Sequence, residues 1–160
     1  MVDLEEIKSK VLEGIELETV LGKISWNEFE SFVAEIFRDN GFFVKQNFRF
    51  KTKSRYEIDV IAIKDKLIFC VDCKEWSAGR YKKSGLKNAV KNQEIRMAEL
   101  KKFMKNNIIA KGMLNVPSKY DLHTLIVTLL EEDLIKEYNT TIVPAWKLNS
   151  FLLGLQNYLE

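Results

Sequence analysis

The spacing of apolar residues predicts two helices at the start of the chain. Residues 3–21 carry apolar side chains at helical intervals, which indicates one amphipathic helix. Ser25 is a favourable N-cap for a second helix, and Glu28 three residues later completes a capping box. We expect this second helix to end at Asn40-Gly41, a typical stop signal.

Three strands are expected next. Residues 42–50 alternate between apolar and polar, which predicts a strand with one buried face. Residues 58–63 and 67–74 are apolar at nearly every position and are joined by a turn at 64–66. Strands that are apolar on both faces are typical of the centre of a sheet covered on each side.

The second half of the chain alternates helices and strands. We expect a loop over 77–85, a long helix to about residue 107, a strand over 123–130, a short helix over 131–138, a strand over 140–146 and a helix over 147–158. This order predicts an α/β fold, a mixed α+β sheet flanked by helices. Residues 1–160 are expected to form one domain, with 1–24 as an N-terminal helical extension.

Composition supports a folded protein and adds little about partners. Hydrophobic residues make up 46% of the 160 residues, which is enough for a sizeable core. The 25 Lys and Arg nearly balance the 23 Asp and Glu, so the net charge of +2 does not by itself indicate a nucleic-acid binder. No apolar run approaches the roughly 20 residues that span a bilayer. The acidic N-terminus does not resemble a signal peptide, so we expect a cytoplasmic protein without membrane contact.

Cysteine and histidine do not suggest a metal site. Cys70 and Cys73 form a C-x-x-C spacing inside a strand, where positions three apart point to opposite faces. Both are expected to be buried apolar residues, because thiols on opposite faces cannot chelate one zinc ion. His123, the only histidine, is expected at the edge of the core.

Strand geometry brings two carboxylates together. If residues 64–67 close the hairpin, Asp59 lies opposite Asp72 on the same face, about 5 Å away. Lys74, two residues further on, shares that face. Two such carboxylates repel each other unless a cation lies between them, and oxygen ligands favour Mg²⁺ or Mn²⁺. The alternative is an exposed ion pair between Asp72 and Lys74 with no catalytic role.

The second helix offers a third carboxylate. Glu30 lies just beyond the edge of the apolar face, where it can reach over the sheet. The alternative is an ordinary carboxylate at the boundary of that face.

These residues resemble a known family. The segments Trp26-Asn27-Glu28-Phe29-Glu30, Glu57-Ile58-Asp59-Val60-Ile61 and Val71-Asp72-Cys73-Lys74 are similar to the PD-(D/E)xK nuclease superfamily, and most of all to Mrr-like restriction endonuclease domains. The resemblance covers roughly residues 25–130. It implies a restriction-endonuclease-like core of order αβββαβ with extra terminal helices.

The resemblance also implies roles for particular residues. Asp59 and Asp72 would be metal ligands, with the carbonyl of Cys73 as a third, and Lys74 would be the catalytic lysine. Glu30 would help hold metal or water, and Gln93 would match a glutamine on the following helix. Asp72 departs from Mrr-like domains, which often have Glu or Gln there.

Basic residues flank the proposed site and are expected to bind nucleic acid. They are Lys51, Lys53 and Arg55 before Asp59, and Arg80, Lys82 and Lys83 after Lys74. Such a patch would hold phosphates without reading bases. The alternative for each lysine is a solvated surface position.

The sequence therefore predicts a Mg²⁺-dependent (or Mn²⁺-dependent) endonuclease acting on duplex or branched DNA. A Holliday-junction resolvase is a narrower version that would need a homodimer. An inactive nucleic-acid-binding module of the same fold and a structural subunit are the alternatives. The sequence does not decide between DNA and RNA.

Overall fold

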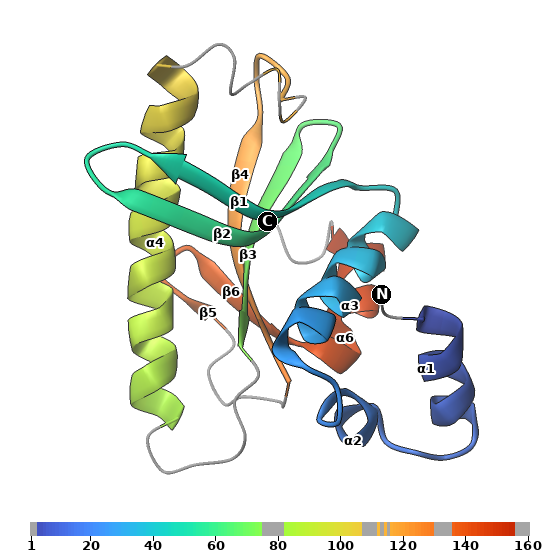
Figure 1. Ribbon diagram of the computed structural model, residues 1–160. Helices are drawn as coiled ribbons and strands as arrows, with labels where there is room; N and C mark the ends of the chain where they lie inside the picture. The colour runs from blue at the N-terminus through green and yellow to red at the C-terminus, as the bar shows by residue number, and fades with distance from the viewer. Residues whose placement is uncertain are drawn as a thin grey trace.

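A mixed sheet of six strands forms the centre of the molecule (Figure 1). The computed structural model describes residues 3–74, 82–106, 112, 114, 116–129 and 136–155. The strands are β1 (Phe43–Lys51), β2 (Arg55–Lys64), β3 (Leu67–Lys74), β4 (Asp121–Thr128), β5 (Lys136–Glu137) and β6 (Thr140–Pro144). Their order in the sheet is β1-β2-β3-β4-β6-β5, antiparallel from β1 to β3 and parallel from β3 through β4 to β6.

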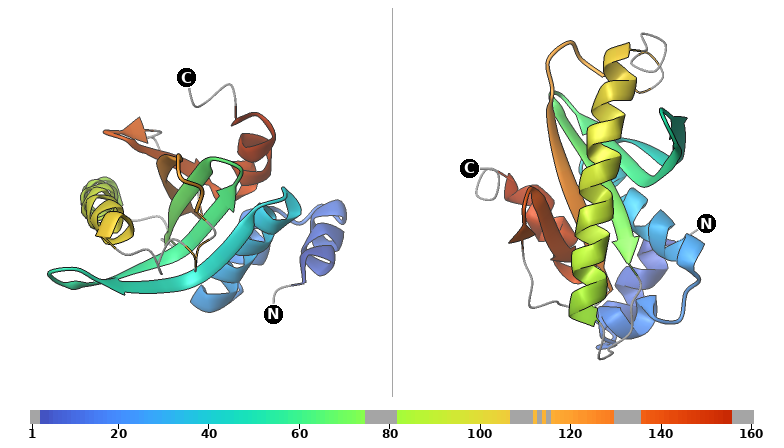
Figure 2. Two further views of the ribbon diagram at one scale, coloured as in Figure 1. Left: turned by 90° about the horizontal axis from the view of Figure 1, so that it is seen from above. Right: turned by 90° about the vertical axis from the view of Figure 1, so that its left-hand side faces the viewer.

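Helices cover both faces of the sheet, as the predicted fold class requires. The helices are α1 (Leu4–Leu12), α2 (Leu17–Leu21), α3 (Trp26–Asp39), α4 (Lys82–Asn106) and α6 (Ala145–Leu153). Figure 2 shows that, among the described helices, α4 lies on one face and α3, α6 and α1 lie on the other. This arrangement is consistent with a restriction-endonuclease-like α/β core.

Each face has its own apolar core. Between the sheet and α3, Phe29 and Phe37 pack with Phe69 and Val71 of the sheet. Between the sheet and α4, residues such as Ile61 contact the buried side of the long helix. Cys70 lies in the second core and Cys73 in the first, both as free buried thiols. The prediction that the two cysteines point to opposite faces is confirmed.

The predicted single helix over residues 3–21 is wrong. α1 ends at Leu12, Gly14 adopts a φ of +92°, and α2 begins at Leu17. A left-handed glycine reverses the chain and lets α2 bury Leu21 in the core on the α3 face. The capping box at the start of α3 is confirmed, since Ser25 and Glu28 exchange two hydrogen bonds of 3.3 Å.

Three further boundaries differ from the prediction. α4 begins at Lys82, inside the expected loop, and α6 begins directly after Pro144, inside the expected strand. Residues 136–137 form strand β5 and not the end of a helix, because they pair antiparallel with β6. Glu94 of α4 accepts hydrogen bonds from Asn139 and Thr140, in the turn and at the start of β6 that follow. Residues 75–81, 107, 130–135 and 156–158 of the predicted elements lie outside the described residues.

Within the described ranges, no helix is both long enough and apolar enough to cross a membrane.

Candidate active site

The hairpin of β2 and β3 has the predicted register. The pairs run from Lys64 opposite Leu67 to Val60 opposite Val71. Asp59 and Asp72 occupy the next position, where regular pairing stops. There the Asp59 Oδ2 accepts a hydrogen bond of 2.9 Å from the backbone N–H of Cys73. The strands therefore separate at the two carboxylates, and a side chain takes over the bond that a backbone carbonyl would have accepted.

A local twist in the sheet lies next to Asp59. The facing residue in β1 is Asn47, which has a φ of 51° and is skipped in the pairing of β1 with β2. Ile58 packs in the core on the α4 face, whereas Val60 packs in the core on the α3 face. In a regular strand these two residues would share a face. At Asp59, β2 therefore changes which of its side chains face α3 and which face α4. The Asp59 carboxylate lies at this point.

Asp72 is buried between two cations. Its side chain is 6% exposed, with Lys74 Nζ 3.2 Å from Oδ2 and Arg96 Nη1 3.6 Å from Oδ1. Oδ2 is inaccessible to solvent and accepts no hydrogen bond of good geometry. The predicted alternative of an exposed ion pair does not describe this site, because burial removes the screening that makes surface pairs weak.

Gln93 connects this site to α4. Its amide Nε2 donates a 2.9 Å hydrogen bond to the carbonyl of Cys70 in β3, and its Oε1 accepts a 3.2 Å bond from Arg96. Gln93 is 1% exposed, so both ends of the amide are fixed. Arg96 was not among the residues predicted from the sequence. The available signal was its spacing of three residues from Gln93, which places both on one side of a helix.

Glu30 reaches the same region from α3, on the opposite face. It is 4% exposed, and burial raises its pKa. The Trp26 side chain counteracts this by hydrogen bonding, while the charges of Glu57 and Asp72 raise the pKa further. The structure thus brings Glu30 into electrostatic contact with the hairpin carboxylates.

Asp59 carries the largest resolved shift among these carboxylates. Burial raises its pKa from 3.8 to about 7, and the charges of Asp72 and Glu30 add to the effect. The hydrogen bond from the Cys73 N–H opposes the shift without cancelling it. A carboxyl group in this environment is half protonated near neutral pH unless a cation joins it.

The donor set fits a hard cation only in part. No group of three or more His, Cys, Asp or Glu side chains in the described ranges is arranged to hold a metal. Asp59 and Asp72 provide oxygen donors of the kind that Mg²⁺ prefers, and that ion usually keeps several waters. The remaining positions would fall to the Cys73 carbonyl, water and a substrate phosphate.

Thiolate and imidazole ligands are disfavoured at this site. Burial raises the pKa of Cys70 to about 12 and that of Cys73 well above its usual value. His123 packs its ring 5.5 Å from the Phe69 ring, as expected for a residue at the core edge.

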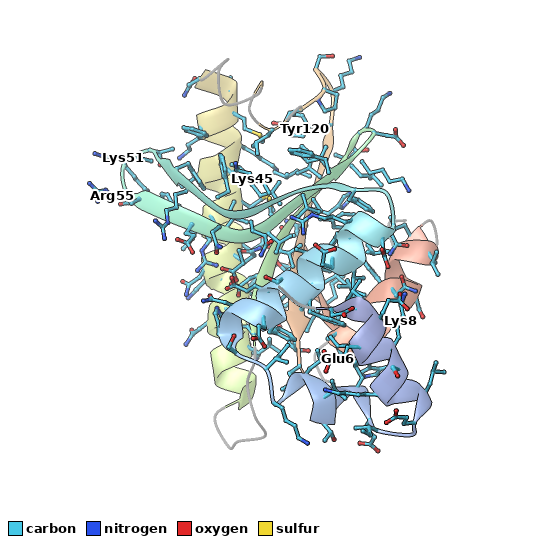
Figure 3. All side chains as sticks on the ribbon, turned by 45° about the vertical axis from the view of Figure 1, so that its right-hand side comes forward. Glu6, Lys8, Lys45, Lys51, Arg55 and Tyr120 are labelled. Carbon is cyan, nitrogen blue, oxygen red and sulfur yellow. The ribbon has the colours of Figure 1, made fainter. Side chains whose placement is uncertain are left out.

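The first group of basic residues lies on a hairpin that projects from the sheet. Lys51 pairs with Arg55 at its tip, which Figure 3 shows extending away from α3. These two residues help to line an open cleft of about 600 Å³ together with Arg49, Phe50, Tyr56 and Glu57. Lys53 instead lies 3.8 Å from Glu99 of α4, where Thr52 also hydrogen-bonds to Glu99.

The second basic group is only partly described. Lys82 and Lys83 form the first turn of α4, and Arg80 lies outside the described residues.

The mixed sheet flanked by helices is consistent with a restriction-endonuclease-like α/β core. A family model described as "Nuclease-related domain" matches residues 25–128. The chain belongs to this nuclease-related domain family, which falls within the PD-(D/E)xK-like nuclease class.

Individual relatives are less informative. An uncharacterized protein of Archaeoglobus fulgidus is 31% identical over 135 residues, covering 84% of this chain and 94% of that protein. The crystal structure of AF1548, a protein of unknown function, has a TM-score of 0.38 and 17% sequence identity. The match covers 79% of this chain and 54% of the AF1548 chain. The crystal structure of protein VC1899 from Vibrio cholerae has a TM-score of 0.36 and 12% sequence identity. The match covers 82% of this chain and 32% of the VC1899 chain.

Proposed function

We propose that this protein is a metal-dependent endonuclease that hydrolyses phosphodiester bonds in DNA. The observation that carries the proposal is the Asp72 Oδ2 atom, which is buried and has Lys74 3.2 Å away, with Asp59 beside it. Membership of the nuclease-related domain family supports the same reaction class.

Each residue of the site has a distinct task. Asp59 and Asp72, with the carbonyl of Cys73, would hold Mg²⁺ or Mn²⁺. When bound there, the ion would supply Lewis-acid polarisation of a phosphoryl oxygen and would lower the pKa of a bound water. Lys74 orients the attacking water and stabilises negative charge that develops on the phosphate. Glu30, a buried carboxyl group whose pKa is raised by desolvation, would help to hold metal or water from α3.

The substrate would lie across the open end of the β2–β3 hairpin. Asp59 is four residues from Arg55, a span of about 13 Å along a strand. A duplex that contacts the cations at the hairpin tip therefore places a phosphate near the carboxylates about four base pairs away, given the 3.4 Å spacing per base pair. Contacts of this type position the substrate without reading its sequence.

Cleavage assays test the proposal. Plasmid, linear duplex and four-way junction DNA are incubated with the protein in Mg²⁺, in Mn²⁺ or in EDTA. We expect cleavage with either metal and none in EDTA. Asp72→Asn and Lys74→Met, which nearly keep the side-chain size, should each reduce kcat by at least about 100-fold. Preferential junction cutting would identify a resolvase, and the Mrr-like resemblance favours cutting of duplex DNA.

A control variant separates lost chemistry from lost charge. Lys66→Met neutralises an exposed lysine at the closed end of the same hairpin, about 27 Å from Lys74 along the strand. It should retain full activity. Wild-type protein that is inert on every substrate with both metals would contradict the proposal.

An inactive nucleic-acid-binding domain is the second candidate. The described residues contain two oxygen ligands in the site and no cluster of three, which favours this reading. It predicts salt-sensitive DNA binding without cleavage and without heat on Mn²⁺ titration.

A further inference from the structure

Arg96 lies beside the candidate active site but has no role in the reaction proposed above. Its Nη1 donates to Gln93 Oε1 at 3.2 Å and lies 3.6 Å from Asp72 Oδ1. Gln93 is itself bound to the backbone of β3 through the carbonyl of Cys70. The guanidinium is therefore placed against the carboxylate by a chain of contacts that begins in the sheet.

The contact with Asp72 supplies charge and does not occupy the oxygen. A separation of 3.6 Å is too long for a hydrogen bond. The positive charge of Arg96 therefore favours the Asp72 carboxylate, while the lone pairs of the carboxylate oxygen stay available to another cation. Lys74 already provides one positive charge at 3.2 Å. A second cation beside one carboxylate is more than neutralisation of Asp72 alone requires.

Arg96 also reaches solvent. Its side chain is 27% exposed, compared with 6% for Asp72. The guanidinium is a planar fork with five N–H donors that matches two oxygens of one phosphate. Both observed contacts to Gln93 and Asp72 involve Nη1 alone.

We propose that Arg96 is the cation of this site that binds the scissile phosphate, and that Gln93 is the residue that positions it. Before substrate arrives, Arg96 and Lys74 together balance the carboxylates. When a phosphodiester enters, Arg96 contacts its non-bridging oxygens from the α4 side. The inference rests on the proposed function, because it names a phosphate contact of the same reaction.

If Arg96 has this role, its neutralisation should change the affinity for metal and the rate of substrate cleavage in opposite directions. Arg96 repels a divalent cation at Asp72 and attracts the phosphate, so its neutralisation strengthens metal binding and weakens catalysis. A residue that only supported the fold would weaken both or change neither. The two readouts therefore separate the proposed role from a structural one.

The experiment compares Arg96→Gln, Arg96→Lys and a control, Lys105→Gln, which neutralises an exposed lysine near the end of the same helix. Mn²⁺ affinity is measured by calorimetry without nucleic acid, and folding by thermal melting. We expect Arg96→Gln to bind Mn²⁺ roughly tenfold more tightly, since a unit charge several ångströms away is removed. Arg96→Lys keeps the charge and should match wild type, as should Lys105→Gln.

Substrate readouts complete the test. With Mg²⁺, kcat/KM for DNA should fall about 100-fold in Arg96→Gln and less in Arg96→Lys, which lacks the fork. If Arg96→Gln is folded but binds Mn²⁺ as wild type does or more weakly, the inference is wrong and the proposed function still stands. The same holds if kcat/KM of Arg96→Gln lies within about threefold of wild type. Wild type that binds no Mn²⁺ and cleaves nothing overturns the inference together with the proposed function.

Discussion

Removing the charge of Asp59 should stabilise the metal-free protein at neutral pH. Burial raises the Asp59 pKa from 3.8 to about 7, so the folded state holds a proton that the unfolded chain releases at lower pH. The contribution of this group to stability is complete below about pH 4 and is lost as the pH rises to about 7. Asp59→Asn keeps a carbonyl oxygen for the Cys73 N–H and cannot ionise.

The size of the effect follows from the shift. A pKa of about 7 against 3.8 is a difference of 3.2 units, which corresponds to about 4 kcal/mol at 1.36 kcal/mol per unit. Asn accepts a weaker hydrogen bond than a carboxylate, which reduces the gain by about 1 kcal/mol. We therefore expect Asp59→Asn to exceed wild type by about 1 to 3 kcal/mol at pH 8 and to differ little at pH 4.

Urea denaturation in EDTA at both pH values measures this difference. Asp65→Asn is a matched control, because it neutralises an exposed aspartate whose φ of 54° Asn tolerates equally well. The control should show no comparable change with pH. The reasoning is refuted if the free energy of unfolding of Asp59→Asn differs from that of wild type by the same amount at pH 4 and pH 8. It is also refuted if Asp59→Asn is less stable than wild type at pH 8.

Two further predictions concern other parts of the chain. Gly14→Ala should destabilise the protein by about 1 kcal/mol in urea denaturation, because an L-residue at φ +92° is strained although no atom lies within 4 Å of the added Cβ. Gly112→Ala, also in open space, is its control, and equal stability of both variants would contradict the assignment to backbone strain. Neutralising Lys51 and Arg55 together by Gln should weaken duplex binding and reduce the slope of log affinity against log salt by about 2, measured by fluorescence anisotropy in EDTA. The double variant Lys8→Gln, Lys10→Gln on α1 should leave that slope unchanged, and an unchanged slope in the hairpin variant would exclude the tip from the interface.

Local pattern was sufficient for strands β2 and β3 and for the register of their hairpin. The apolar runs of β2 and β3 and the short turn between them determine which residues face each other, and side-chain alternation has a period of two. The capping box of α3 is equally local, since Ser25 and Glu28 are three residues apart. The register from Lys64 opposite Leu67 to Val60 opposite Val71 was predictable for this reason.

Boundaries that depend on distant partners were not predictable. Gly14 divides the first helix because the core on the α3 face accepts Leu21, and Glu94 of α4 holds the turn that follows β5. An amphipathic pattern shows that a segment has an apolar face, but it does not show which surface that face will meet.

The sequence by itself determined strands β2 and β3, the register between them and the candidate carboxylates that they carry, because these depend on neighbouring residues and on strand alternation. Only the tertiary structure decided that β2 changes faces at Asp59, opposite Asn47, that Lys53 lies 3.8 Å from Glu99, and that Arg96 lies beside Asp72. Each of these depends on where α4 or a second strand lies relative to the hairpin. Burial then determines the charge state of Asp59, since desolvation depends on the packing around a carboxyl group and not on its position in the chain.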